Sequence, residues 1–120
     1  MAYIKDYQSG QILLTIENEY IKEFPSGRFR YRINGDKVAD YPSGRYVYDI
    51  GNNYVKEFPS GRYLLSISNG QVRIYTSGFI IASYDNSYIK DFRTGRYLYK
   101  IDGFLSGREM VALLAVLFAI

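Results

Sequence analysis

Carboxylates and arginines are the residues of this sequence that could do chemistry, and they recur with a fixed spacing. Five acids lie 17 residues apart or at a multiple of 17, and four of them precede an arginine by five residues: Asp6, Glu23, Asp40, Glu57 and Asp91, then Arg28, Arg45, Arg62 and Arg96. Carboxylates beside arginines could serve acid–base catalysis. They could equally form cross-strand ion pairs if each pair faces across a tight turn. One copy loses both charges together, as Ile74 and Phe79, which favours ion pairs.

Composition removes most other catalytic chemistry. The 120 residues include no cysteine and no histidine, so thiolate nucleophiles and thiolate metal ligands are excluded, and the commonest general base is missing. We therefore predict that the protein is not an enzyme, has no catalytic residue, and uses neither a cofactor nor a metal.

Basic residues mixed with tyrosines suit single-stranded nucleic acid. They form two rows along the repeats: Lys5, Lys22, Lys56, Arg73 and Lys90, then Arg30, Arg32 and Lys100. Acids are interleaved with them and the net charge is only +3, whereas a nucleic-acid footprint needs cations clustered on one face. We expect neither nucleic acid nor a membrane as a partner.

A partner site is predicted in the copy that lost its charges. Ile74, Phe79 and Ile81 occupy positions 4, 9 and 11, which we expect to face outward, and they form an apolar patch where the other copies are mostly charged near the turn; Arg73 and Tyr75 adjoin them. Exposed apolar patches of this kind commonly mark interfaces. We predict self-association, or contact with another protein, through this copy; sequence drift or a covering N-terminus is the alternative.

A second kind of binding is suggested by tyrosine hydroxyls and by asparagines near the expected turns, namely Asn52, Asn53, Asn69 and Asn86. Such groups around a concave rim suit a carbohydrate, a small polar ligand or an anionic polymer. Turn formation explains the asparagines equally well.

The elements that must position these residues are six repeats of 17 residues in a single domain, 1–120. The repeats are 3–19, 20–36, 37–53, 54–70, 71–87 and 88–104. Repeat position 8 is always glycine and position 7 is always serine or threonine, which predicts a tight turn with a glycine at positive φ. Positions 15–17 are again turn residues, so each repeat is expected to be one β-hairpin.

The second strand of each hairpin alternates, with apolar or aromatic residues at positions 10, 12 and 14 such as Tyr46, Tyr48 and Ile50. This predicts that all three positions face the core. In the first strand, positions 2 and 5 are always apolar or aromatic although three residues apart. We predict a bulge at positions 3–4 that turns those two residues outward and lets positions 2 and 5 both face inward. The alternative is a regular strand with the position-3 lysines on the aromatic face.

The chain ends in an apolar run after Glu109. Ser106 and Glu109 form a capping-box signature, which predicts a helix over 107–120. A helix without a polar face must be surrounded, and about twelve strands closed into a barrel leave room for one helix. We therefore predict an all-β fold with one C-terminal α-helix, a closed meander barrel around that helix. An open twisted sheet or a sandwich with the helix on one face is the alternative.

Phe104–Arg108 repeats the pattern of Phe58–Arg62 with one substitution. This aromatic-x-x-Gly hairpin unit resembles MORN-type repeats, which have a different period and more glycines, and no function follows from it. The prediction is a non-catalytic structural or protein-interaction module. Repeat sequence begins at Tyr3 without a signal peptide, and the apolar end is shorter than the roughly 17–25 residues of a membrane span. With no cysteine either, we expect a cytoplasmic location.

Overall fold

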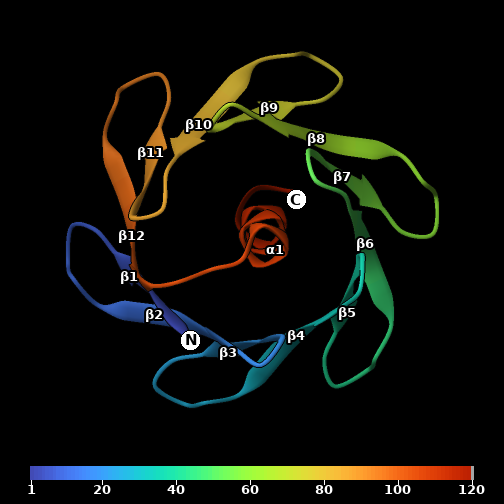
Figure 1. The fold of residues 1–120 in the computed structure, drawn as a ribbon, viewed down its shortest axis with the longest axis horizontal. Helices are drawn as coiled ribbons and strands as arrows, with labels where there is room; N and C mark the ends of the chain where they lie inside the picture. Colours follow the sequence, from blue (N-terminus) through green and yellow to red (C-terminus); the bar gives the residue numbers. More distant parts are fainter. Residues whose placement is uncertain (120) are drawn as a thin grey trace.

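The computed structural model describes residues 1–119 and consists of a ring of twelve β-strands with one α-helix at its centre (Figure 1). The strands are β1 (Ala2–Asp6), β2 (Ile12–Glu17), β3 (Tyr20–Glu23), β4 (Phe29–Asn34), β5 (Lys37–Asp40), β6 (Tyr46–Ile50), β7 (Tyr54–Glu57), β8 (Tyr63–Ser68), β9 (Gln71–Ile74), β10 (Ile80–Tyr84), β11 (Tyr88–Asp91) and β12 (Tyr97–Gly103), and the helix is α1 (Gly107–Phe118). All strands belong to one closed antiparallel barrel. The predicted meander barrel is confirmed, and the described residues form no open sheet or sandwich.

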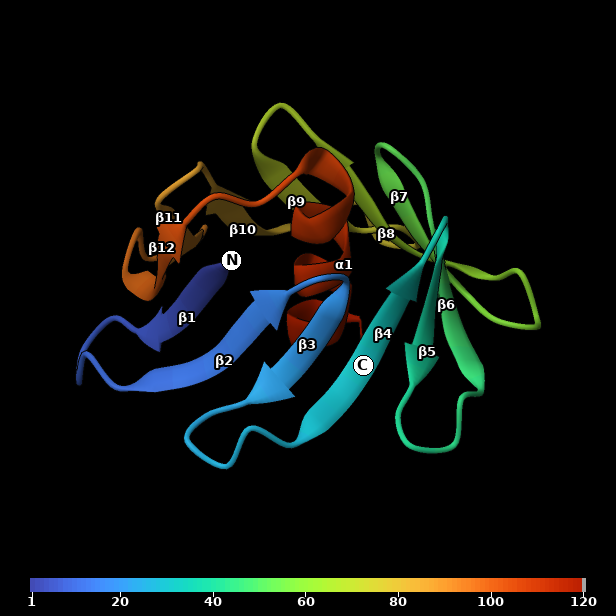
Figure 2. The same cartoon turned by 60° about the horizontal axis from the view of Figure 1, so that its bottom comes forward.

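Each 17-residue repeat contributes one hairpin with a tight turn at its glycine. Gly61, for example, has φ +75° and its N–H donates to the carbonyl oxygen of Glu57 at 2.8 Å. Because the strands alternate in direction, all six of these turns lie at the same end of the barrel. We call this end the flared mouth, formed by residues 7–11, 24–28, 41–45, 58–62, 75–79 and 92–96. Figure 2 shows these turns splaying outward, while α1 begins at the opposite end.

The barrel closes between its first and last strands. β1 pairs with β12 in a regular register in which Ile4 is opposite Ile101 and Ala2 is opposite Gly103. Lys5 and Asp102 form an ion pair across this seam. Closure leaves no unpaired strand edge, which in an open sheet would expose free backbone N–H and C=O groups.

Each hairpin contains a β-bulge, but not where the sequence predicted it. The register shifts between repeat positions 2 and 3 of the first strand, so that Ile4 is opposite Leu14 and Lys5 is opposite Ile12. The extra residue is Leu13, at position 11 of the second strand, and the same shift recurs in the other five hairpins. The predicted bulge at positions 3–4 is wrong, and the first strand is regular.

This register puts the position-3 lysines and the position-10 aromatic residues together on the outer face. Lys56 Nζ lies 4.9 Å from the centre of the Tyr63 ring, and Lys22 and Lys90 lie in the same way over Phe29 and Tyr97. The predicted inward direction of position 10 is therefore wrong, and the alternative placement of the lysines on the aromatic face is correct. Position 5 also differs from the prediction, since most of its aromatic side chains are exposed.

The core is formed by positions 2 and 14 of the repeats and by the helix. Every position-2 residue is fully buried, for example Ile4 and Val55. At position 11 the side chains Val47, Leu64 and Ile81 pack against the core, because the bulge brings positions 11 and 12 to the same side. Helix residues Met110–Ala115 are all buried.

Helix α1 begins at the predicted capping box, and its first turn is bonded to the barrel. Ser106 Oγ accepts from the Glu109 N–H at 3.2 Å, and Glu109 Oε1 accepts from the Ser106 N–H at 2.9 Å. Arg108 Nη1 donates to the Gly35 carbonyl oxygen at 3.2 Å. The helix ends at Phe118 with Ala119 as its C-cap; the predicted helical residue Ile120 lies outside the described residues.

The molecule is broad and shallow, with extents of 37 × 33 × 21 Å. A helix of twelve residues is about 18 Å long, which matches the short dimension. None of the helical segments found within residues 1–119 has the length and apolar character needed to cross a membrane.

Candidate binding surfaces

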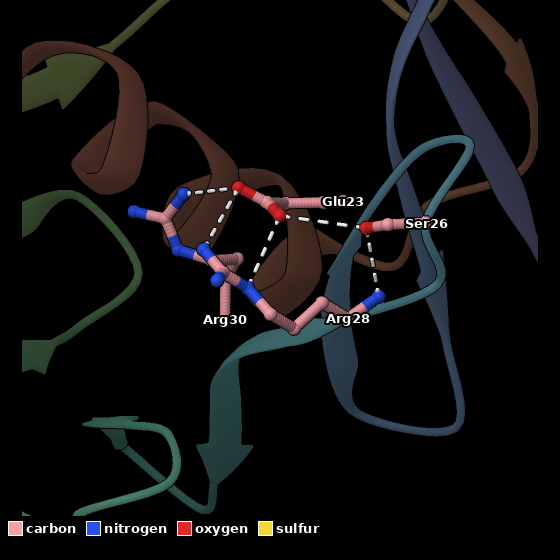
Figure 3. Close-up of polar contacts among 4 residues, drawn as sticks. All are labelled: Glu23, Ser26, Arg28 and Arg30. Carbon is pink, nitrogen blue, oxygen red and sulfur yellow. Dashed lines mark hydrogen bonds and ion pairs between the residues drawn. The ribbon is translucent and has the colours of Figure 1, made fainter.

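The acid–arginine pairs form in some hairpins and not in others. In the second hairpin, Glu23 Oε2 lies 2.8 Å from Arg30 Nη1 and Glu23 Oε1 lies 3.2 Å from Arg28 Nε, as Figure 3 shows. In the fourth hairpin, Glu57 lies 3.5 Å from Arg62. Among residues 1–119, the predicted pairs of Asp40 with Arg45 and of Asp91 with Arg96 are not formed. Aspartate is one methylene shorter than glutamate and bonds within its own turn instead.

The turn hydrogen bonds of the aspartates are short and local. Asp91 Oδ2 accepts from Thr94 Oγ1 at 2.7 Å and from the Thr94 N–H at 3.0 Å. Asp6 accepts from the Ser9 N–H at 2.9 Å. The pKa of Asp91 is lowered first by the Thr94 side-chain hydrogen bond, and the pKa of Asp6 first by the Ser9 backbone hydrogen bond. The hydrogen bond from Arg30 is the main cause of the lowered pKa of Glu23. These hydrogen bonds therefore favour the ionised form of all three carboxyls.

The outer face carries three aromatic clusters that the sequence reasoning missed. Each combines positions 1 and 10 of one repeat with position 5 of the next, in Tyr20–Phe29–Tyr41, Tyr54–Tyr63–Tyr75 and Tyr88–Tyr97–Tyr7. Rings that pair within a cluster have centres 4.6–6.4 Å apart. The sequence feature that could have predicted these clusters is the recurrence of a lysine at position 3 with an aromatic residue at position 10, because cations favour aromatic faces. The predicted row of position-3 cations is therefore spread around the outer wall.

The fifth hairpin exposes large apolar side chains, as predicted. Phe79 is 71 % exposed, Tyr75 is 53 % exposed and Ile74 is 37 % exposed. Tyr75 stacks on Tyr63 with ring centres 4.7 Å apart. The backbone N–H of Ile74 donates to the Phe79 carbonyl oxygen at 2.9 Å, so these two residues are direct neighbours across the turn.

The other two predicted members of this patch are less exposed. Ile81 packs against the core instead of facing outward, and it lines a hollow of about 290 Å³ with Ile74, Leu64 and Phe118. Arg73 donates to the Gly78 carbonyl oxygen at 3.3 Å and to Gln71 Oε1 at 3.4 Å. The guanidinium is thus folded back onto its own hairpin, and the exposed surface reduces to Ile74, Tyr75 and Phe79, which we call the fifth-hairpin patch.

The asparagines of the predicted ligand rim are divided between two roles. Asn52 and Asn53 line an open hollow of about 620 Å³ together with Tyr54 and Arg108, at the end of the barrel where α1 begins. Asn69 has φ 52°, the left-handed conformation that asparagine tolerates in turns. Asn86 lies in the turn between β10 and β11. The four asparagines do not form one site.

Comparison of the chain with known protein families, with curated proteins and with solved structures finds no match.

Proposed function

We propose that this chain is a non-catalytic protein-interaction module that pairs with a second copy of itself through the fifth-hairpin patch. The observation that carries the proposal is the joint replacement of the acid and the arginine by Ile74 and Phe79, which leaves Phe79 71 % exposed. A phenylalanine exposed to this degree gains about 1.5–3 kcal/mol when it is fully buried.

The chemistry of the patch favours a second copy as the occupant. Around a two-fold axis, a residue meets itself or its close neighbours on the other subunit. In the second and fourth hairpins this would bring each carboxylate close to its own copy, and each guanidinium close to its own copy, and like charges repel. In the fifth hairpin, Ile74, Tyr75 and Phe79 are uncharged, and aromatic residues at the centre of an interface commonly carry most of its binding energy.

The arrangement of the ionisable groups supports a non-catalytic role. The carboxyl groups of Glu23, Asp6 and Asp91 have pKa values lowered by turn hydrogen bonds and ion pairs, whereas a general acid requires a raised pKa. The cytoplasmic location expected from the sequence stays a prediction.

The test is the molar mass in solution over a concentration series, measured by light scattering and by sedimentation. We expect a monomer–dimer equilibrium in the unmodified chain, and Phe79→Arg to shift it to monomer. Phe104→Arg is the matched control, because Phe104 is 78 % exposed at the other end of the barrel.

A chain that is monomeric throughout the series, or a Phe79→Arg variant that dimerises like Phe104→Arg, would overturn the proposal. A monomer would leave a different protein as the occupant of the patch.

A further inference from the structure

The third repeat has an alanine where every other repeat has a long cation on its outer face. Position 3 is Lys5, Lys22, Lys56, Arg73 and Lys90 in the other five repeats, and Ala39 here. The cross-strand partner of Ala39 at position 10 is Tyr46. Among the hairpins with an aromatic residue at position 10, the other three have a lysine over the ring. Ala39 cannot reach its partner ring, and space is left open beside it.

The open space is a defined pit on the outer wall of the barrel. A row of side chains crosses β3 to β6 there, in the order Tyr20, Arg32, Ala39 and Tyr46. The pit has a volume of about 170 Å³, with Ala39 at its floor and the rings of Tyr20, Tyr41 and Tyr46 in its walls. Tyr20 and Tyr41 stand at 90° to each other with ring centres 6.4 Å apart. The pit is therefore a corner formed by aromatic faces.

Polar groups with free hydrogen-bonding capacity complete the wall. Asn34 Nδ2 donates to the Tyr46 hydroxyl oxygen at 3.0 Å, which leaves the amide oxygen of Asn34 and the hydroxyl hydrogen of Tyr46 for a ligand. The Arg32 guanidinium lies 5.8 Å from the Tyr20 ring centre and forms no ion pair with residues 1–119. Arg32 is the one cation among the residues that line the pit, and Asp40, whose Oδ2 accepts a hydrogen bond from Ser43 Oγ at 3.1 Å, is the one anion.

We propose that this pit binds one sugar ring that carries a carboxylate, the chemistry of a uronic acid. The volume of the pit is well below the roughly 300 Å³ at which pockets hold drug-sized ligands, so one six-membered ring fits. The positively polarised C–H face of a pyranose lies against the negative face of an aromatic ring. A planar guanidinium binds a carboxylate with two parallel hydrogen bonds, and Asn34 and Tyr46 provide an acceptor and a donor for hydroxyl groups.

Competing ligands fit these walls less well. A nucleobase sandwiched between rings needs parallel aromatic faces, and Tyr20 and Tyr41 are perpendicular. A quaternary ammonium ion suits an aromatic cage, but here it would meet the guanidinium of Arg32. A neutral sugar would leave the guanidinium unpaired.

The experiment is a titration of ¹⁵N-labelled protein with methyl β-D-glucuronide and methyl α-D-galacturonide, followed by amide chemical shifts. Methyl β-D-glucoside is the neutral probe, and benzoate is the probe for the anion alone. We expect at least one uronide to shift the amides of residues 32, 39 and 46, and to bind about tenfold more tightly than the glucoside, as one charge-assisted hydrogen-bonded pair requires.

Two variants test the residues of the pit. Ala39→Met fills the pit with a side chain of lysine length and no charge, and should abolish the shifts while the fold is kept, because five repeats accommodate that length. Arg32→Gln should weaken uronide binding about tenfold. Arg45→Gln, which removes the same charge from an exposed arginine outside the pit, should leave binding unchanged.

An oligouronide arm distinguishes the source of the ligand. Oligogalacturonate that binds more tightly than the methyl uronide, with the same amides shifted, identifies an acidic polysaccharide. Equal affinity identifies the free sugar acid. The proposal is overturned if neither uronide shifts these amides, if the glucoside or benzoate binds as tightly as the uronide, or if Ala39→Met binds like the unmodified protein.

Discussion

The Tyr48 hydroxyl donates a hydrogen bond to the carbonyl oxygen of Ala119 at 3.0 Å, and so ties the barrel wall to the last turn of the central helix. The carbonyl groups at the end of a helix have no partner inside the helix. The two residues are 71 positions apart in the chain. Together with Arg108 and Gly35 at the first turn, this contact fixes the helix at both ends.

Tyr48→Phe should lower the free energy of unfolding by about 1 kcal/mol, the usual value of one hydrogen bond, measured by urea denaturation at neutral pH. Burial is the main cause of the raised pKa of Tyr48. A raised folded-state pKa gives stability that is complete below the unfolded value of about 10 and is lost as the pH rises through the folded value. The unmodified protein should therefore lose stability above about pH 10, and Tyr48→Phe should lose less of it. An unchanged alkaline slope would contradict this.

Glu23→Gln should destabilise the protein more than Glu57→Gln, because Glu23 is paired with both Arg28 and Arg30 whereas Glu57 is paired with Arg62 alone. The pKa of Glu23 is lowered, chiefly by the hydrogen bond from Arg30. Its contribution is present above the unfolded value of about 4.5 and is lost as the pH falls through the folded value. Urea midpoints at pH 7 and at stepwise lower pH check this. Equal midpoints for the two variants at pH 7 would show that the Arg30 contact adds nothing.

Ending the chain after Gly107 should leave no folded monomer. Met110–Ala115 are buried, and large apolar side chains contribute about 1.5–3 kcal/mol each on full burial, against a net stability of about 5–15 kcal/mol for a whole domain. Leu113→Ala, which keeps the helix, should cost about 2–5 kcal/mol and stay folded. Circular dichroism melting separates the two outcomes, and a truncated chain with a sharp cooperative transition would refute the expectation.

Gly103→Ala should cost more stability than Gly61→Ala. Both glycines have positive φ, +111° and +75°, where a Cβ costs about 1–2 kcal/mol. A Cβ at Gly61 meets no atom within 4 Å, whereas a Cβ at Gly103 would overlap the Met1 carbonyl oxygen and lie 3.0 Å from the Ala2 Cα. The extra cost falls on the seam between β1 and β12. Thermal melting of the two variants measures the difference, and equal melting temperatures would mean that the N-terminus gives way freely.

The architecture was predictable because its signals are periodic and strong. Gly61 and its five equivalents mark the turns, the even number of strands allows closure, and Ser106 with Glu109 marks the start of the helix. The direction of Tyr46 was not predictable in the same way. A bulge adds one residue to a strand, and so moves every side chain beyond it to the other face. The lysine pattern was compatible with a bulge in either strand, and only the cross-strand pairs show which strand contains it.

The candidate sites also differ in how far they could be predicted from the sequence. Ile74 and Phe79 could be found from sequence, because a departure from a repeat is visible without coordinates. The failure of Asp40 to pair with Arg45 depends on the length of one side chain. The pit beside Ala39 depends on the row formed with Arg32 and Tyr46, and that row exists only once the bulge in β6 is placed correctly.

The aromatic clusters restrict how many hairpins a barrel of this kind can gain or lose. Tyr7 of the first hairpin completes the cluster of Tyr88 and Tyr97 in the sixth, so the clusters recur every second hairpin all the way round, including across the seam. The unit of symmetry is therefore 34 residues, twice the repeat length. A barrel that gained or lost one hairpin would place side by side two hairpins with aromatic residues at both positions 1 and 10, or two without them. Growth by duplication of two hairpins at a time would keep the alternation intact.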